Sequence, residues 1–192
     1  MIDTSFLLCP EPEKPGEKWN GQGWGFLDPA NVSVSVCWED IANIISPDNI
    51  LEIGFFAGHS STTMLNIWPK SNVISFDPGS FARRAHKNVK DKFPDRFKFY
   101  PVGINKHHGD LPNIDLMFID GSHAKRDVEI DIAHINILKP KYVLFDNVEL
   151  GEVRTAIKAA GLMDSSKNPL YFFYTCNHKG KTCPGIMMLL IL

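Results

Sequence analysis

The stretch Ile50–Ser60, Ile-Leu-Glu-Ile-Gly-Phe-Phe-Ala-Gly-His-Ser, decides the fold of this chain. It starts with a short apolar run that ends at Gly54, and a helical pattern follows from Ser60. Gly54 and Gly58 permit a tight turn between the two, because glycine adopts backbone angles that other residues avoid. We therefore expect a strand, a glycine turn and the start of a helix, where backbone N–H groups can approach a ligand closely.

Apolar runs and helical patterns alternate along the rest of the chain from about residue 35. Such alternation produces right-handed βαβ units and a largely parallel sheet. The last two strands have no helix between them, so they should pair antiparallel. The sequence thus predicts an α/β fold with a doubly wound, mostly parallel seven-stranded sheet and an antiparallel C-terminal edge pair. The expected strands are 49–53, 72–76, 97–102, 114–119, 142–145, 170–175 and 186–192, and the expected helices are 36–45, 60–68, 81–93 (capped by Ser80), 124–138 and 149–160.

Residues 1–34 differ from the remainder of the chain. Between Cys9 and Gly25 there are three prolines, four glycines and two tryptophans, without a helical or strand period. Tryptophans in such a segment usually pack onto something. We therefore expect 1–34 to be an N-terminal arm that acts as a lid, and 35–192 to be one domain.

The composition is that of a globular protein and excludes several partners. Lys and Arg number 20 and Asp and Glu 22, which gives a formal net charge of −2. This balance makes nucleic acid an unfavourable partner, because its capture usually needs a strong basic excess. No apolar run approaches the ~20 residues that cross a bilayer, and the N-terminus lacks the basic start of a secretory signal. We therefore expect no membrane partner. The four cysteines have no CxxC spacing, and we expect a cytoplasmic protein.

The turn in 50–60 is not the G-x-G-x-x-G fingerprint of dinucleotide-binding proteins. Phe56 occupies the place of the second glycine, which argues against a nicotinamide-dependent enzyme. Glu52 lies two residues before the first glycine, where its carboxylate would repel a pyrophosphate. The same carboxylate favours a cationic or amine-bearing ligand.

Acidic side chains directly follow three further predicted strands. Ligands in folds of this kind bind beyond the carboxyl ends of the strands. Asp77, after the second strand, has two open interpretations: it accepts both hydroxyls of a ribose, or it caps the helix that follows Pro78–Ser80. Asp120 and the pair Asp146-Asn147 follow the fourth and fifth strands, which should be neighbours.

Asp120, Asp146 and Asn147 also have two interpretations. Their oxygen atoms are ligands that suit Mg²⁺, Mn²⁺ or Ca²⁺. Alternatively, the two aspartates order their loops by accepting hydrogen bonds from backbone N–H groups. His123 follows Asp120 by one turn, within reach of the same edge.

The segment 50–60 resembles motif I of class I S-adenosylmethionine (SAM)-dependent methyltransferases, which have a Rossmann-like sheet. In the metal-dependent catechol and caffeoyl-CoA O-methyltransferase group this motif reads L-E-x-G-x-[YF]-x-G-x-S. Phe118–His123 is similar to that group's F-[IV]-D-x-x-[KH] segment, and Phe145–Val148 to its [VF]-D-[ND]-V segment. The macrocin-type sugar O-methyltransferases are similar too, and their proposed base is a histidine at the position of His123. The residues that match motif I are Glu52, Gly54, Phe56, Gly58 and Ser60.

The resemblance implies a role for each residue of the cofactor site. The backbone at Gly54–Gly58 would approach the methionine half of SAM, with Glu52 favouring its ammonium and sulfonium groups. Ser60 would hold its carboxylate, and Phe56 would lie against the cation or the ribose. Further cofactor-binding residues are expected to be Asp77 at the ribose, Asn105 in place of the family's acidic residue at the adenine, and Asp120.

The resemblance also implies an acceptor chemistry. Asp120, Asp146 and Asn147 would hold a divalent metal, Mg²⁺ or Mn²⁺, and His123 would be the catalytic base. The expected function is methyl transfer to a hydroxyl of a small molecule or a sugar.

Two alternatives and one further partner stay open. The chain could be a SAM-binding or S-adenosylhomocysteine (SAH)-binding module without catalysis, or a nucleic-acid or protein methyltransferase. Against the second stands Asp120–His123, because base amino-methylases usually carry [ND]-P-P-[YF] there. The C-terminal edge strand is a place where a homo-oligomer could form its contact.

Overall fold

The computed structural model describes residues 32–164, 171–178 and 181–192, and side chains within 38–164 and 188–192. Residues 1–31, most of the predicted arm, lie outside this part. The first helix begins at Val32, before the boundary that we predicted at residue 35. Within the described residues, no helix is long and apolar enough to cross a membrane.

One sheet organises the chain, with the strand order β3-β2-β1-β4-β5-β7-β6. The strands β1 to β5 pair in parallel, and β7 runs antiparallel to both β5 and β6. The predicted doubly wound, seven-stranded fold with its antiparallel edge pair is therefore confirmed. The elements are α1 (Val32–Ile44), β1 (Asn49–Ile53), α2 (His59–Ile67), β2 (Asn72–Phe76), α3 (Ala82–Lys92), β3 (Phe97–Tyr100), the 3₁₀ helix η1 (Ile104–Lys106), β4 (Leu116–Ile119), α4 (Lys125–Leu138), β5 (Tyr142–Phe145), α5 (Gly151–Ala159), β6 (Tyr171–His178) and β7 (Lys181–Ile191).

Most of the expected boundaries shift by one to five residues in the structure, and three of the differences have a clear local description. The strand β3 ends at Tyr100 rather than at residue 102, because Pro101 has no N–H group to donate to the sheet. Phe81, not Ser80, precedes α3, and no side chain caps that helix. The closing strands are longer than expected, since backbone pairing extends into the polar residues up to His178 and Lys181.

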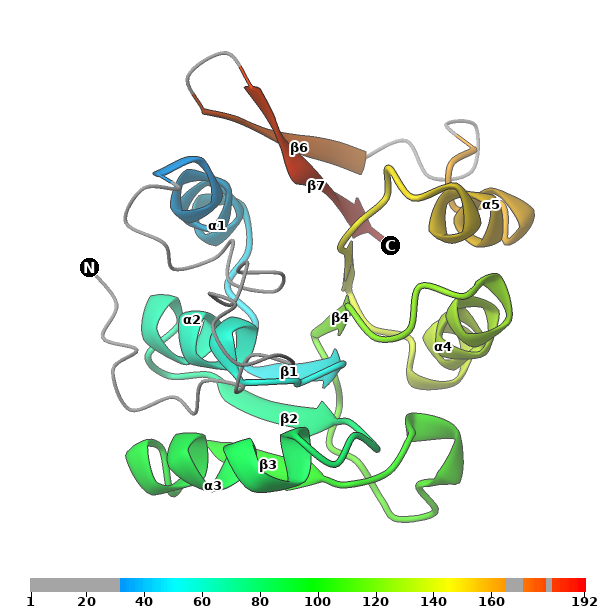
Figure 1. Ribbon diagram of the computed structural model, residues 1–192. Helices are drawn as coiled ribbons and strands as arrows, with labels where there is room; N and C mark the ends of the chain where they lie inside the picture. Colours follow the sequence, from blue (N-terminus) through cyan, green and yellow to red (C-terminus); the bar gives the residue numbers. More distant parts are fainter. Residues whose placement is uncertain (1–31, 165–170, 179–180) are drawn as a thin grey trace, which may run out of the picture.

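Helices cover both faces of the sheet (Figure 1). The helices α1, α2 and α3 lie on one face, where the Trp38 ring meets the Phe118 ring edge-on at 5.6 Å between centroids. The helices α4 and α5 cover the other face with aliphatic side chains such as Val128, Ile132 and Ile157. Burial of these two apolar layers is the dominant favourable contribution to the free energy of folding. The packed layers hold the carboxyl edge of the sheet as a rigid platform.

Arg96, just before β3, fixes the end of α2. Its guanidinium donates hydrogen bonds to the carbonyl oxygens of Leu65 (3.0 Å), Trp68 (3.4 Å) and Ser71 (3.2 Å). The last carbonyl groups of a helix have no hydrogen-bond partner inside the helix, so a cation there can donate to them. The same positive charge interacts favourably with the helix dipole. We expect Arg96→Ala to lower the free energy of unfolding by about 1–3 kcal/mol, measured by urea denaturation. Arg96→Lys should recover part of this loss, and equal stability of all three proteins would contradict the assignment.

Candidate cofactor and catalytic site

Three acidic residues are anchored at the carboxyl edge of the sheet. Each follows the last residue of a strand, and its backbone N–H donates to the last carbonyl of the neighbouring strand. The pairs are Asp77 to Tyr100 (3.1 Å), Asp120 to Ile53 (2.9 Å) and Asp146 to Ile119 (3.1 Å). The sheet therefore fixes the backbone of these residues, and their side chains start from rigid positions.

The turn after β1 lies directly against the end of β4. Gly54 has a φ of 94°, and a Cβ atom on it would lie 1.9 Å from the carbonyl oxygen of Asp120. Gly58 has a φ of 86°, and a Cβ atom there would meet the ring of Phe55 at 2.6 Å. Both positions thus require glycine, as the motif predicted, and the first of them brings the turn next to Asp120.

Asp77 holds this turn in place. Its Oδ2 atom accepts hydrogen bonds from the N–H groups of Phe55 (3.0 Å) and Phe56 (2.8 Å), and its Oδ1 atom accepts one from Gly79 (2.7 Å). Asp77 therefore orders the turn after β1, and the helix-capping interpretation is wrong, because no side chain caps α3. Its contact with a ribose stays a prediction.

Phe56 lies at the surface of the site. Its φ is 47°, a backbone conformation that side chains rarely adopt, and 41% of its surface is exposed. The ring packs against Phe81 with 5.1 Å between the centroids, and the guanidinium of Arg84 lies 5.6 Å from the centre of the Phe81 ring. A strained backbone that presents an aromatic ring at a turn is typical of a residue held for binding.

Glu52 is fully buried beneath the turn. Its carboxylate accepts hydrogen bonds from the hydroxyl groups of Ser60, Ser61 and Ser75. Burial raises the pKa of Glu52 to about 7, although the three hydroxyl groups act in the opposite direction. In this arrangement the hydroxyl of Ser60, which we expected at the carboxylate of SAM, donates to Glu52.

The roles of Ser61 and Ser75 were not predicted from the sequence. A signal for Ser75 was present, because it is a polar residue inside the apolar strand Asn72–Phe76 and stands in register with Glu52. Ser61 follows the matched Ser60 directly, but only the start of α2 at His59 directs its side chain toward Glu52.

The ends of β4 and β5 bring the remaining candidates together. The Nε2 atom of His123 lies 3.9 Å from the Oδ1 atom of Asp120, and the side chains are 48% and 23% exposed. The interaction with Asp120 raises the pKa of His123, burial lowers it, and Asp146 and Asn147 raise it further. Burial, together with repulsion from Asp120, holds the pKa of Asp146 well above its ordinary value. These four side chains thus form one electrostatic cluster.

Two other expectations concern Asn105 at the adenine and the ligands of a metal ion. Asn105 lies on η1 at the same edge of the sheet, with its Oδ1 atom 2.8 Å from where a Cβ atom of Gly103 would be. In the part of the chain that the structure describes, no three His, Cys, Asp or Glu side chains form a group that could hold a metal ion. The metal ligands Asp120, Asp146 and Asn147 therefore remain a prediction.

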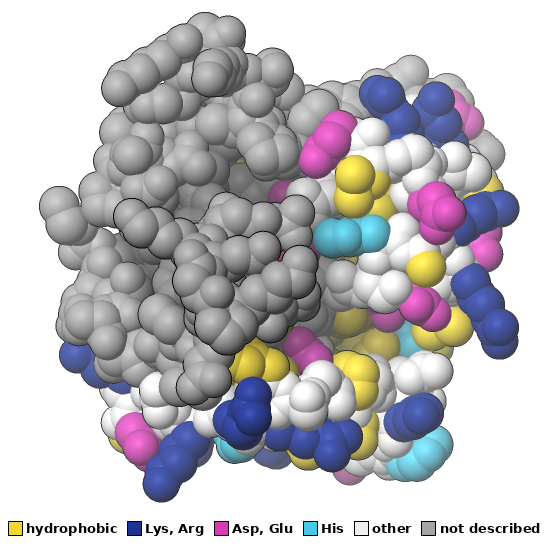
Figure 2. Space-filling view, in the orientation of Figure 1, with side chains coloured by type: hydrophobic (Ala, Val, Ile, Leu, Met, Phe, Trp, Pro, Cys, Tyr) yellow, Lys and Arg dark blue, Asp and Glu magenta, His cyan; other side chains and the backbone are white. Residues whose placement is uncertain are grey.

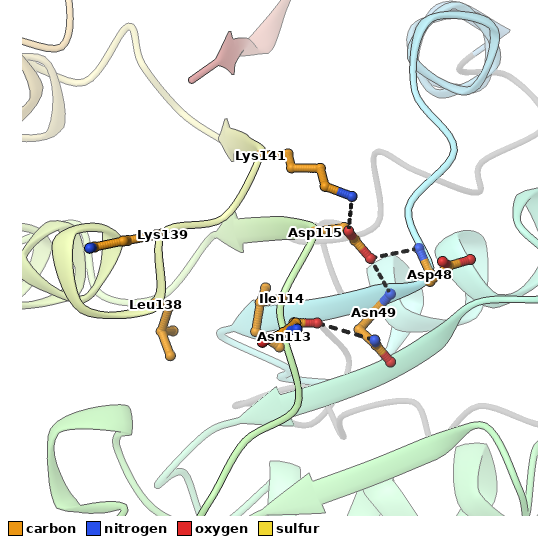
Figure 3. A pocket seen from close by; sticks show the side chains of 8 residues that line it. All are labelled: Asp48, Asn49, Asn113, Ile114, Asp115, Leu138, Lys139 and Lys141. Carbon is orange, nitrogen blue, oxygen red and sulfur yellow. Dashed lines mark hydrogen bonds and ion pairs between the residues drawn. The ribbon is translucent and has the colours of Figure 1, made fainter.

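A hollow of about 590 Å³ lies at the opposite edge, at the amino ends of β1, β4 and β5 (Figure 3). Within it, Asp115 accepts hydrogen bonds from Lys141 (2.7 Å) and from the N–H groups of Asp48 and Asn49 (both 3.0 Å). The three contacts join the amino ends of β1, β4 and β5. Asp115 thereby stabilises the sheet at a distance from the candidate site.

This network predicts a pH-dependent stability. Burial opposes the shift, but the hydrogen bonds from Lys141, Asn49 and Asp48 lower the pKa of Asp115 from 3.8. A lowered pKa stabilises the fold above the unfolded value and loses this effect as the pH falls through the folded value. We expect Asp115→Asn to cost about 1–2 kcal/mol of unfolding free energy at neutral pH, and the difference to shrink at about pH 2–3. Urea unfolding at both pH values measures it, and a pH-independent difference would refute the assignment.

The strand order, the glycine turn after β1 and the acidic residues at the carboxyl edge define a class I SAM-dependent methyltransferase. The chain belongs to the family described as "Methyltransferase domain", which matches residues 51–148. This range contains the turn and every acidic residue discussed at the carboxyl edge. A search of curated proteins gave no significant match.

Solved structures of similar fold include several O-methyltransferases. TomG from Streptomyces achromogenes, in complex with SAM, is 19% identical with a TM-score of 0.60, and the alignment covers 81% of this chain and 78% of TomG. An O-methyltransferase from Bacillus cereus in complex with SAH is 16% identical with a TM-score of 0.62, covering 86% and 82%. A protein described as an rRNA methylase from Clostridium thermocellum is 12% identical with a TM-score of 0.60, covering 83% and 96%. At these identities the likeness supports the fold.

Proposed function

We propose that the protein transfers the methyl group of SAM to a hydroxyl group of a small molecule or a sugar, with the help of a divalent cation. The observation that carries this proposal is the cluster of Asp120, His123, Asp146 and Asn147 next to the glycine turn at Gly54. Carboxylates and an imidazole next to a SAM-binding turn provide what a hydroxyl acceptor needs, namely orientation and removal of its proton.

In the cofactor site, the turn from Gly54 to Gly58 receives the methionine half of SAM. The buried Glu52 would stabilise its cationic groups, and Asp77, which already orders the turn, would hold the ribose hydroxyls. The exposed ring of Phe56 would pack against the sulfonium or the ribose, since aromatic faces attract cations. Asn105, on η1 after β3, is assigned to the adenine.

At the acceptor, His123 removes the proton from the hydroxyl group. The unperturbed pKa of histidine is about 6.5, which suits base catalysis near neutral pH. Asp120, 3.9 Å away, orients the imidazole and stabilises its protonated form. The remaining catalysis is alignment of the acceptor oxygen, the methyl carbon and the sulfur in one line.

A divalent cation would fit the donor set at the same edge. Asp120, Asp146 and Asn147 supply two carboxylates and an amide, which are ligands of hard cations. The pKa of the Asp146 carboxylate is raised by its burial and by Asp120, so the positive charge of a divalent cation would stabilise the ionised forms of these carboxylates. Such an ion would polarise the acceptor hydroxyl as a Lewis acid.

Three measurements test cofactor binding, the acceptor class and metal dependence separately. Calorimetric titration with SAH should show binding, and incubation with SAM and a panel of catechols and sugars should yield SAH only with a hydroxyl acceptor. EDTA should abolish turnover, and Mg²⁺ or Mn²⁺ should restore it. Absence of SAH binding would refute the whole proposal, whereas turnover that survives both EDTA and Asp146→Ala would refute the metal alone.

Bulk RNA in the same panel tests the nucleic-acid alternative. Acidic and basic side chains are interspersed over α4 and α5 on the face shown in Figure 2, so this part offers no uniformly basic surface. We expect no methyl transfer to RNA. SAH binding without turnover on any acceptor would instead favour a binding module.

A further inference from the structure

The buried carboxylate of Glu52 is held by hydroxyl groups from two different elements. The hydroxyl of Ser75 on β2 and the hydroxyls of Ser60 and Ser61 in the first turn of α2 all donate to it. The Oγ atoms of Ser61 and Ser75 are themselves 2.9 Å apart, so these two side chains share the Oε2 atom of Glu52. We call these three residues the serine cage.

The serine cage contains no positive charge. Every group that it contributes is a neutral hydroxyl, and Phe118, which stands in register with Glu52 on β4, is apolar. Among the described residues, the charged group that acts on Glu52 is Asp120, whose charge has the same sign and raises the pKa further. An isolated buried carboxylate is unfavourable without a cation nearby, so its charge depends on what binds next to it.

We propose that Ser61 and Ser75 are positioning residues that hold Glu52 for the cationic methionine end of the cofactor, and that cofactor binding expels a proton from Glu52. This inference rests on the proposed function, in which the cofactor lies in the turn above Glu52. In the free protein part of the Glu52 population carries a proton, which sits on one carboxyl oxygen. On binding, the ammonium group of the cofactor favours the carboxylate, and the proton passes to the buffer.

The raised pKa of Glu52, about 7, puts this proton exchange in an accessible range. A ligand that binds more tightly to the ionised form of a group lowers the pKa of that group. By linkage, its binding then releases protons at pH values near that pKa. At about pH 7 we expect roughly half a proton to leave per SAH bound, with less release toward about pH 8. The hydroxyls of Ser61 and Ser75 lower the pKa of Glu52, so removal of either should raise it.

Calorimetric titration of the full-length protein with SAH, in phosphate and in Tris buffer between about pH 6 and 8, measures the proton count. We expect Ser75→Ala and Ser61→Ala to release more protons at about pH 7 and to bind SAH about 3–10-fold more weakly there, with the affinity recovering toward about pH 8. Ser75→Thr and Ser61→Thr keep a hydroxyl and should restore the wild-type profile. In Glu52→Gln the proton release should vanish.

Ser71→Ala is the matched control. Ser71 is also a buried serine, but its hydroxyl donates to the carbonyl of Pro47, near the amino end of β1. Its replacement should leave the proton count and the pH dependence of SAH binding unchanged. A pH-independent affinity in the wild type, or proton release that persists in Glu52→Gln, would overturn the inference. Failure of the wild type to bind SAH at any pH would instead refute the proposed function.

Discussion

Replacement of Gly54 by alanine is expected to disrupt the site and a large part of the stability of the domain. The new Cβ atom would lie 1.9 Å from the carbonyl oxygen of Asp120 and 2.8 Å from the Cα atom of Gly121. Both neighbours are backbone atoms, so no flexible side chain can move aside. The φ of 94° adds strain, because residues with a Cβ atom rarely adopt it.

The expected magnitude follows from these two effects. Overpacking costs about 1–3 kcal/mol, and a residue in a sparsely populated backbone region costs a similar amount. We therefore expect Gly54→Ala to lower the free energy of unfolding by about 2–6 kcal/mol, against a total of about 5–15 kcal/mol for a typical domain. Urea denaturation measures this loss, and SAH titration should show no binding even where the variant stays folded.

Gly151→Ala is the matched control for this substitution. Gly151 is the first residue of α5, and a Cβ atom there would meet nothing within 4 Å. Alanine at this helical position should be neutral or stabilise the protein by up to about 1 kcal/mol. Equal stability of Gly54→Ala and Gly151→Ala, together with unchanged SAH binding, would show that the turn does not lie against β4 as described.

The contrast between these two glycines also shows what the sequence can predict. The motif marked Gly54 as part of a turn, because a glycine between an apolar run and a helical pattern has a local meaning. Its close approach to Asp120 is a contact between residues far apart in the chain, and it requires β1 and β4 to be neighbours. The alternating pattern predicted a parallel sheet, but the position of β4 beside β1 came only from the structure.

The buried polar groups illustrate the same limit. Glu52 was assigned to a cationic ligand from its place before the glycine turn. That interpretation did not require knowledge of the residues that hydrogen-bond to Glu52 in the fold. Its protonation depends on Ser75, which β2 brings into register, and on the first turn of α2. The two interpretations of Asp77 could not be separated from sequence either, because a carboxylate between a strand and a helix can serve a helix cap and a ligand alike.

The largest effect on catalysis is expected for His123. Its Nε2 atom lies 3.9 Å from Asp120, and 48% of the side chain is exposed, so an acceptor can reach the imidazole. A positioned general base typically contributes a factor of about 10²–10⁴ to the rate. We expect His123→Ala to lower kcat by this factor, measured as SAH formation with whichever hydroxyl compound the wild type methylates.

SAH titration of His123→Ala shows whether the loss of kcat arises in the chemical step or from weaker cofactor binding. SAH affinity of His123→Ala should stay within about threefold of the wild type, because the cofactor residues lie at the turn after β1 and His123 acts only on the acceptor proton. His108→Ala removes an exposed histidine from the loop after η1 and should leave kcat unchanged. A normal kcat in His123→Ala would assign proton removal to another group. A kcat loss accompanied by an equal loss of SAH affinity would mean that His123 supports the cofactor site instead, because a residue that acts only in the transition state changes the rate without changing ground-state binding.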